Sequence, residues 1–491
     1  MKNHRHALLA AVSLLAISGT VGTASAADFD APSYASWTGF YGAIGGGGRY
    51  GFSGVPIDQF DDQGDLLGPI GGGRDLGDVG AFGTVELGYD KQFEGSNLVI
   101  GVVGNFDFGE ALSAAVNETT MGGVSAVASW KVDNSWGIGA RAGFQASRST
   151  LFYGVVGFTQ ADITTSVSAG MGTMASTFSD SDWESGFFVG AGIETMLTDQ
   201  IGAKLEYRYA NYGGASVISD TFSTMGSDVA NRAKADLETH SVRGTLVWRF
   251  GNAGAPEAEA AATLPGGPAS WTGFYAAAGV GGRFVFNDLE ANQIEVNSGD
   301  TKVIGNLEDF GEPDAFGTVE LGYDRQLGGN GIVIGAVANF DFAGGASAAV
   351  TTTSMGGKTT TVADWNIGNS WGIGVKAGIQ AMESTLVYGV AGFTQADITS
   401  SVSAGMGGKG PTSSDSNWES GFFVGAGIET MLSEQVGAKL EYRYANYDGS
   451  SVTSDVYSTM GTDAVNVASS GDIDTHSVRA TLVWRFGNLG D

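Results

Sequence analysis

The 491-residue sequence contains no cysteine, which excludes a disulfide framework and thiolate metal sites. Cations are also scarce, because 24 Lys and Arg residues stand against 53 Asp and Glu residues. Phosphate binding needs clustered cations, so nucleic acid is not an expected partner. Charged residues nevertheless make up only 16% of the chain, and it is too apolar for a disordered protein.

Long apolar runs are missing as well. After residues 1–26, no stretch approaches the roughly 18 consecutive apolar residues of a membrane-spanning helix. Apolar content without apolar runs indicates alternation, which is the pattern of β-strands with two different faces.

The N-terminus has the features of a secretory signal peptide. Lys2 and Arg5 form a basic region, an apolar segment of about a dozen residues follows, and an Ala-x-Ala cleavage pattern ends at Ala26. We therefore predict a signal peptide over residues 1–26, followed by a short N-terminal segment over residues 27–35.

The rest of the chain is a tandem duplication. WESGFFVGAGIETML starts at Trp183 and again at Trp418, and GAKLEYRYANY starts at Gly202 and again at Gly437. A fixed period of this kind indicates repeated structural units. The predicted organisation is a first unit over 36–251, a polar linker over 252–269, a second unit over 270–487 and a tail over 488–491.

Each copy is expected to contain eight strands, each about as long as a tilted transmembrane strand. In the first copy they are 37–49, 81–93, 98–108, 135–145, 150–163, 185–197, 201–212 and 239–250. Short turns alternate with long polar loops between them, as in outer-membrane barrels, whose long loops lie outside the cell. The predicted fold is all-β, a transmembrane antiparallel β-barrel with periplasmic termini.

The two faces of these strands differ. Leu205 and Tyr207 share one face of their strand, and Glu206 and Arg208 share the other. In a barrel the apolar face meets lipid and the charged face points inward. The predicted inward-facing charge network is Glu86, Asp90, Asp107, Arg141, Glu194, Lys204, Glu206, Arg208, Arg243 and Arg249 in the first copy, and Glu320, Asp324, Asp341, Lys376, Glu429, Lys439, Glu441, Arg443, Arg479 and Arg485 in the second.

Tryptophans lie at both ends of the strands, as in the two aromatic girdles of a membrane barrel. The predicted membrane-interface aromatics are Trp37, Trp136, Trp183, Trp248, Trp271, Trp371, Trp418 and Trp484.

Three segments, WTGFYGAIGGG, LEYRYANY and VRGTLVWRFG, resemble the porin-family outer-membrane β-barrel proteins of alphaproteobacteria. These belong to the eight-stranded superfamily that includes the transmembrane part of OmpA. The resemblance implies an outer-membrane location among lipid and lipopolysaccharide, and insertion by the barrel assembly machinery. Phe250 and Phe486 match the terminal aromatic residue that this machinery reads. The five residues after Phe486 and the second barrel unit depart from the family pattern.

Either two eight-stranded barrels or one 16-stranded barrel could form, because the eighth strand of copy one could pair with the first strand of either copy. Eight strands enclose an interior that side chains can fill, whereas about 16 leave an aqueous channel. The long linker, the WRF motif that ends each copy and the five acidic against five basic inward residues per copy favour two barrels.

No catalytic residue, cofactor site or metal site is predicted. His240 and His476 each precede a serine, but adjacent strand residues point to opposite faces, so they are interpreted as polar rim residues. The acidic loop residues around Asp58 and Asp75 lack calcium-loop spacing and are interpreted as solvated, with divalent-cation binding left open. The predicted function is a structural and surface-exposed envelope protein rather than an enzyme. The alternative is a porin for small hydrophilic solutes.

Overall fold

The computed structural model describes most of the chain. The described residues are 37–61, 65–93, 95–109, 112–119, 124–147, 149–171, 174–218, 222–224, 227–250, 270–295, 301–328, 331–353, 360–405, 412–453, 457–458 and 464–486. The predicted signal peptide, N-terminal segment, linker and tail lie outside these ranges.

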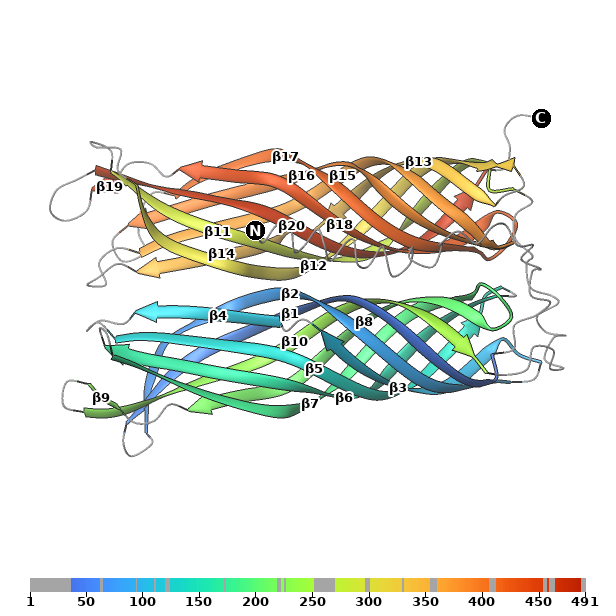
Figure 1. The fold of residues 1–491 in the computed structure, drawn as a ribbon. Coiled ribbons are helices and arrows are strands. Elements are labelled where there is room, and N and C mark those ends of the chain that lie inside the picture. Colours follow the sequence, from blue (N-terminus) through green and yellow to red (C-terminus); the bar gives the residue numbers. More distant parts are fainter. Residues whose placement is uncertain are drawn as a thin grey trace.

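The first copy forms a closed ring of eight antiparallel strands (Figure 1). In ring order these are β1 (Gly39–Asp61), β2 (Leu66–Gln92), β3 (Leu98–Gly109), β5 (Val124–Gln145), β6 (Thr150–Met171), β7 (Met174–Met196), β8 (Ile201–Ile218) and β10 (Ser227–Arg249). The ring closes because β10 pairs with β1, with Arg249 opposite Tyr41. Two short strands, β4 (Leu112–Thr119) and β9 (Phe222–Thr224), pair with β5 and β10.

The second copy forms an equivalent ring. Its strands are β11 (Gly273–Glu295), β12 (Thr301–Leu327), β13 (Ile332–Ala343), β15 (Thr360–Met382), β16 (Thr385–Gly405), β17 (Thr412–Met431), β18 (Val436–Thr453) and β20 (Ala464–Arg485), with β14 (Ala346–Thr353) and β19 (Tyr457–Ser458) as short additions. Arg485 of β20 lies opposite Tyr275 of β11 and closes this ring.

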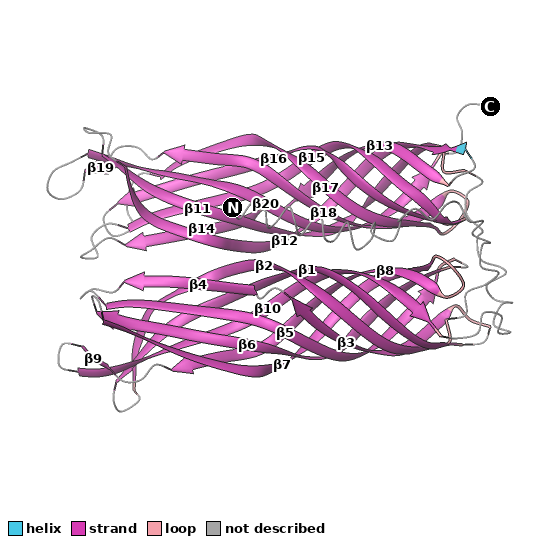
Figure 2. Cartoon of the chain, in the orientation of Figure 1, coloured by secondary structure: helices cyan, strands magenta, loops and turns pink. Residues whose placement is uncertain are grey.

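Each eighth strand therefore pairs with the first strand of its own copy. The prediction of two tandem eight-stranded barrels is confirmed, and the alternative of one 16-stranded barrel is wrong. The barrels lie side by side with their short turns at the same end (Figure 1), and strands make up nearly all of the described chain (Figure 2). No helix within the described ranges is long and apolar enough to cross a membrane.

The strands are longer than the sequence predicted at the long-loop end. The predicted strands 37–49 and 81–93 lie almost entirely within β1 and β2, whose pairing continues to Phe60 opposite Leu66. The alternation of polar and apolar residues fades in this part of the sequence, so periodicity did not predict these extensions. Backbone hydrogen bonding continues without it.

Inward and outward side chains alternate along each strand. In β3, Val99 and Val103 are buried while Leu98, Ile100 and Val102 are exposed on the outer surface. The packed core of each copy therefore lies inside its barrel.

Candidate functional site: the filled barrel interior

All twenty residues of the predicted charge network are buried, and all of them lie in the two barrel interiors. Ionic groups held away from water are costly unless each has partners of opposite charge. The pairs they make therefore decide whether each interior is packed or open.

At the short-turn end of the first barrel, Arg249 bridges two carboxylates. Its guanidinium lies 2.9 Å from Asp90 and 2.7 Å from Glu194. Arg141 contacts the same carboxylates at 3.0 and 2.9 Å. These four side chains come from β2, β5, β7 and β10, so the cluster links opposite walls of the barrel.

Farther along the interior, Glu206 accepts hydrogen bonds from Arg208 at 2.6 Å and from Tyr153 at 2.8 Å. Lys204 pairs with Glu86. Toward the long-loop end, Arg243 lies 3.2 Å from Asp107.

The second barrel repeats this arrangement with one change of residue type. Arg485 lies 2.9 Å from Asp324 and 2.7 Å from Glu429. Lys376 stands where the first barrel has Arg141, and it reaches Asp324 at 2.7 Å.

Tryptophans fill the interior on both sides of the charges. Trp37 is fully buried at the short-turn end, where the Arg249 guanidinium lies 4.5 Å from its ring. Trp130 is buried toward the long-loop end, in a cluster with Leu112 and Ile163. Trp271 and Trp365 occupy the equivalent places in the second barrel.

Little space remains around the charges at the long-loop end of the second barrel. A polar cavity in the second barrel, lined by Arg283, Asp341 and Arg443 among others, has a volume of about 20 Å³. That volume holds about one water molecule. Buried charges and tryptophans thus fill the described interior of each barrel, as eight strands allow.

Six of the eight predicted interface tryptophans lie on the outer surface of the barrels. Trp183, Trp248, Trp418 and Trp484 are each about half exposed. Trp136 and Trp371 make edge contacts with the outward-facing rings of Phe158 and Phe393. The terminal aromatics Phe250 and Phe486 are exposed at the short-turn ends.

The assignment of Trp37 and Trp271 to the membrane interface is wrong. Both are fully buried inside the barrels. The position of a residue along its strand determines how close it lies to the end of the barrel. Whether its side chain points inward or outward depends instead on the alternation of successive residues. Trp37 lies four residues before the inward-facing Tyr41 and so shares its face. The alternation of the strand therefore indicates an inward position for Trp37.

The same alternation identifies two interior cations that sequence reasoning missed. Arg49 is buried and donates to the Asp133 carbonyl at 2.7 Å. Arg283 in the second barrel lies 2.8 Å from Asp314. Each interior therefore holds one more basic residue than the five predicted from the sequence.

The histidines are not rim residues. The Nδ1 atom of His240 lies 2.7 Å from the Tyr207 hydroxyl, and its ring packs 4.7 Å from Phe284 of the other barrel. Ser241 faces the interior, where its hydroxyl donates to the Arg208 carbonyl at 3.5 Å, so it points away from His240. Among the described residues, no group of three or more potential ligand side chains could hold a metal ion.

Close packing against glycine gives a first testable prediction. A Cβ atom added at Gly88 would lie 2.3 Å from the Tyr41 ring, inside the barrel. We expect Gly88→Ala to lower the free energy of unfolding by about 1–3 kcal/mol, because overpacking displaces the ring. Urea unfolding of the refolded protein measures this. Gly104→Ala is the control, since its Cβ would have no neighbour closer than 3.8 Å, and equal effects would contradict the packed interior.

The comparisons with known proteins agree with this architecture. A family model described as "Outer membrane protein beta-barrel domain" matches residues 11–250 and 254–486. The chain is 26% identical over 216 residues to the 31 kDa outer-membrane immunogenic protein of Brucella melitensis biotype 1, covering 44% of this chain and 84% of that protein. It is 28% identical over 177 residues to the 22 kDa outer membrane protein of Rhizobium leguminosarum bv. viciae, covering 36% and 65% respectively. These matches confirm the resemblance seen in the sequence.

Solved structures with similarity include a FadL homologue of Pseudomonas aeruginosa, at 11% identity over 91% of this chain and 90% of that chain, with a TM-score of 0.23. Ail, the attachment invasion locus protein of Yersinia pestis, is 13% identical over 43% of this chain and 99% of its own, with a TM-score of 0.20.

Proposed function

This chain belongs to the outer-membrane β-barrel domain family, and from that premise we propose that it is a non-conducting envelope protein with a structural and surface-exposed role. The observation that carries the proposal is the filled interior. Arg249, Arg141 and their two carboxylates cross the first barrel near one end, and Arg485 and Lys376 do the same in the second. Ions or solutes would have to displace these paired charges to pass.

The proposed orientation places the short turns in the periplasm and the long-loop ends outside the cell. Outer-membrane barrels have short periplasmic turns and longer extracellular loops. Half-exposed tryptophans such as Trp183 and Trp248 suit the two lipid–water interfaces. In this orientation the partners are outer-membrane lipid and lipopolysaccharide. Phe250 and Phe486 would be read by the barrel assembly machinery during insertion. The name of the Brucella relatives, immunogenic outer-membrane protein, suits surface-exposed loops.

Conductance in a planar lipid bilayer tests the proposal. Refolded protein, shown to be folded by its altered mobility on an unheated SDS gel, should insert without giving stable current steps. The expectation follows because eight-stranded barrels with packed interiors leave no aqueous channel. A 16- to 18-stranded porin measured under the same conditions is the positive control.

Uniform, long-lived current steps from the folded protein would overturn this proposal. The function would then be passive diffusion of small hydrophilic solutes.

A further inference from the structure

The outer surface of each barrel has two unlike sides. Leu87 and Val102 on one side of the first barrel are 73% and 56% exposed. Ile193, Leu205 and Val242 face outward as well, yet they are at most 5% exposed. They form one buried cluster with Phe284, Phe286 and Ile428 of the second barrel. The second barrel therefore covers them.

The contact is built from equivalent residues of the two copies. The ring of Tyr50 stacks on that of Phe284 at 5.1 Å, and the ring of Phe52 stacks on that of Phe286 at 5.7 Å. In each case the two residues are 234 positions apart, which is the offset between the two SWTGFY motifs at Ser36 and Ser270. Equivalent residues that touch each other lie on a twofold axis, so the interface has the symmetry of a homodimer.

The same symmetry continues to both ends of the contact. Near the short turns, the Thr150 and Thr385 hydroxyls lie 3.1 Å apart. Thr195 and Thr430, one from each barrel, complete a cluster of four hydroxyls. At the long-loop end the backbones of Leu76 and Phe310, again equivalent residues, pair as strands.

Polar groups on this face find partners across the contact. The Tyr50 hydroxyl of the first barrel lies 3.2 Å from both the Tyr442 hydroxyl and the Nδ1 atom of His476. Polar side chains on a lipid-facing surface are costly, and they usually mark a contact or function within the membrane. Here Tyr50, Thr150 and His476 are buried instead of facing lipid.

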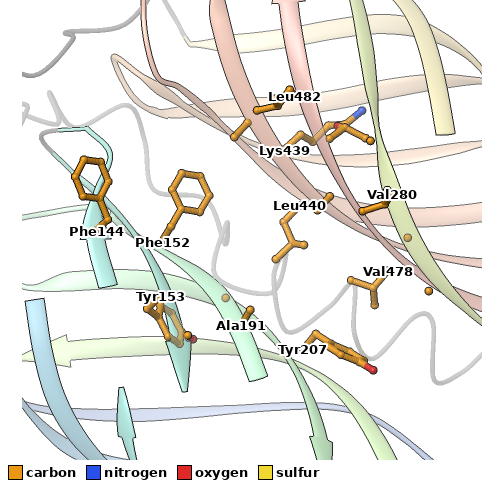
Figure 3. A pocket seen from close by; sticks show the side chains of 18 of the residues that line it. Phe144, Phe152, Tyr153, Ala191, Tyr207, Val280, Lys439, Leu440, Val478 and Leu482 are labelled. Carbon is orange, nitrogen blue, oxygen red and sulfur yellow. The ribbon is translucent and has the colours of Figure 1, made fainter. Parts of the chain in front are cut away.

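An apolar groove of about 960 Å³ follows one flank of the contact (Figure 3). Phe144 and Phe152 of the first barrel line one wall, and Val280, Leu440 and Val478 of the second line the other. Beside this groove the contact follows a strip, from the threonine cluster at one end to the stacked aromatic rings and the Leu76–Phe310 pair at the other.

We propose that this strip is a specific recognition surface whose partner is the second copy of the same unit, so that the chain is a fused, pseudo-twofold dimer of barrels within the membrane. The inference goes beyond the proposed envelope role. It implies that the loops of both barrels are presented at one fixed spacing.

Engineered cysteines test the proposal in the full-length protein, because the natural sequence has no cysteine. The hydroxyls of Ser147 and Ser384 lie 3.1 Å apart across the contact. In the double variant Ser147→Cys/Ser384→Cys, refolded and inserted into lipid vesicles at low density, mild oxidation should remove both free thiols. Peptide mass mapping should then show a disulfide within one chain. The same treatment should leave the thiols of Leu87→Cys/Leu321→Cys free, because both positions are exposed and so lie outside the contact, where no thiol of the other barrel is within reach.

A second pair keeps the test valid if the serine variant does not fold. Phe52→Cys/Phe286→Cys probes the other end of the strip, where the two rings stack. Free thiols in both folded interface pairs, or disulfides that join different chains, would overturn the proposal. Neither outcome bears on conductance, so the proposed envelope role would stand or fall separately.

Discussion

Arg249→Met should lower the free energy of unfolding by about 3–5 kcal/mol, since removing one partner of a buried ion pair leaves uncompensated charge. Arg249 contacts Asp90 and Glu194, and both carboxylates are fully buried. Arg141 would remain as their ion-pair partner, so one guanidinium would face two carboxylates. Urea unfolding of the refolded protein in detergent micelles, followed by mobility on an unheated SDS gel, measures the loss.

The matched control is an ion pair at the surface. Lys131 lies 2.8 Å from Asp133, but its side chain is 50% exposed. Lys131→Met should change the free energy of unfolding by less than about 1 kcal/mol, because water screens such pairs. Adding Asp90→Asn to Arg249→Met should recover part of the loss, since it removes one of the stranded charges. Equal, small effects of Arg249→Met and Lys131→Met would mean that water fills the interior, and the non-conducting function would have to be abandoned.

Trp37→Ala should also be strongly destabilising, by about 3–5 kcal/mol, which is the usual cost of removing a large buried ring. The Trp37 ring is fully buried against Val99, Leu151 and Met196, and it carries the Arg249 guanidinium on its face. The same unfolding measurement applies.

Trp248→Ala is the control for the Trp37 variant, because Trp248 lies at the same end of the barrel but is 51% exposed on the outer surface. Its replacement should cost clearly less. If both tryptophans were girdle residues, as the sequence alone suggested, the two variants would lose similar, small amounts of stability. That result would contradict the inward position of Trp37.

Much of the interior could be predicted from the sequence because a β-strand has a strict period of two. Once Glu206 and Arg208 are placed on the inward face, the direction of every other charged side chain of the same strand is fixed. Applying that rule to β1 and the two residues before it would also have placed Trp37 and Arg49 inside, on the same face as Tyr41. Trp130 lies outside the segments in which alternation was recognised, so its burial could not be predicted in this way.

The sequence by itself determined the duplication, the transmembrane strands of each copy and the inward or outward direction of most side chains, because these depend on local periodicity. Only the tertiary structure decided that β10 pairs with β1 rather than β11, since both first strands offer similar backbone ladders. It alone also distinguished Leu205, which is covered by the second barrel, from Leu87, which is exposed. Both are apolar and outward-facing, and which of them becomes buried depends on where the second barrel packs against the first.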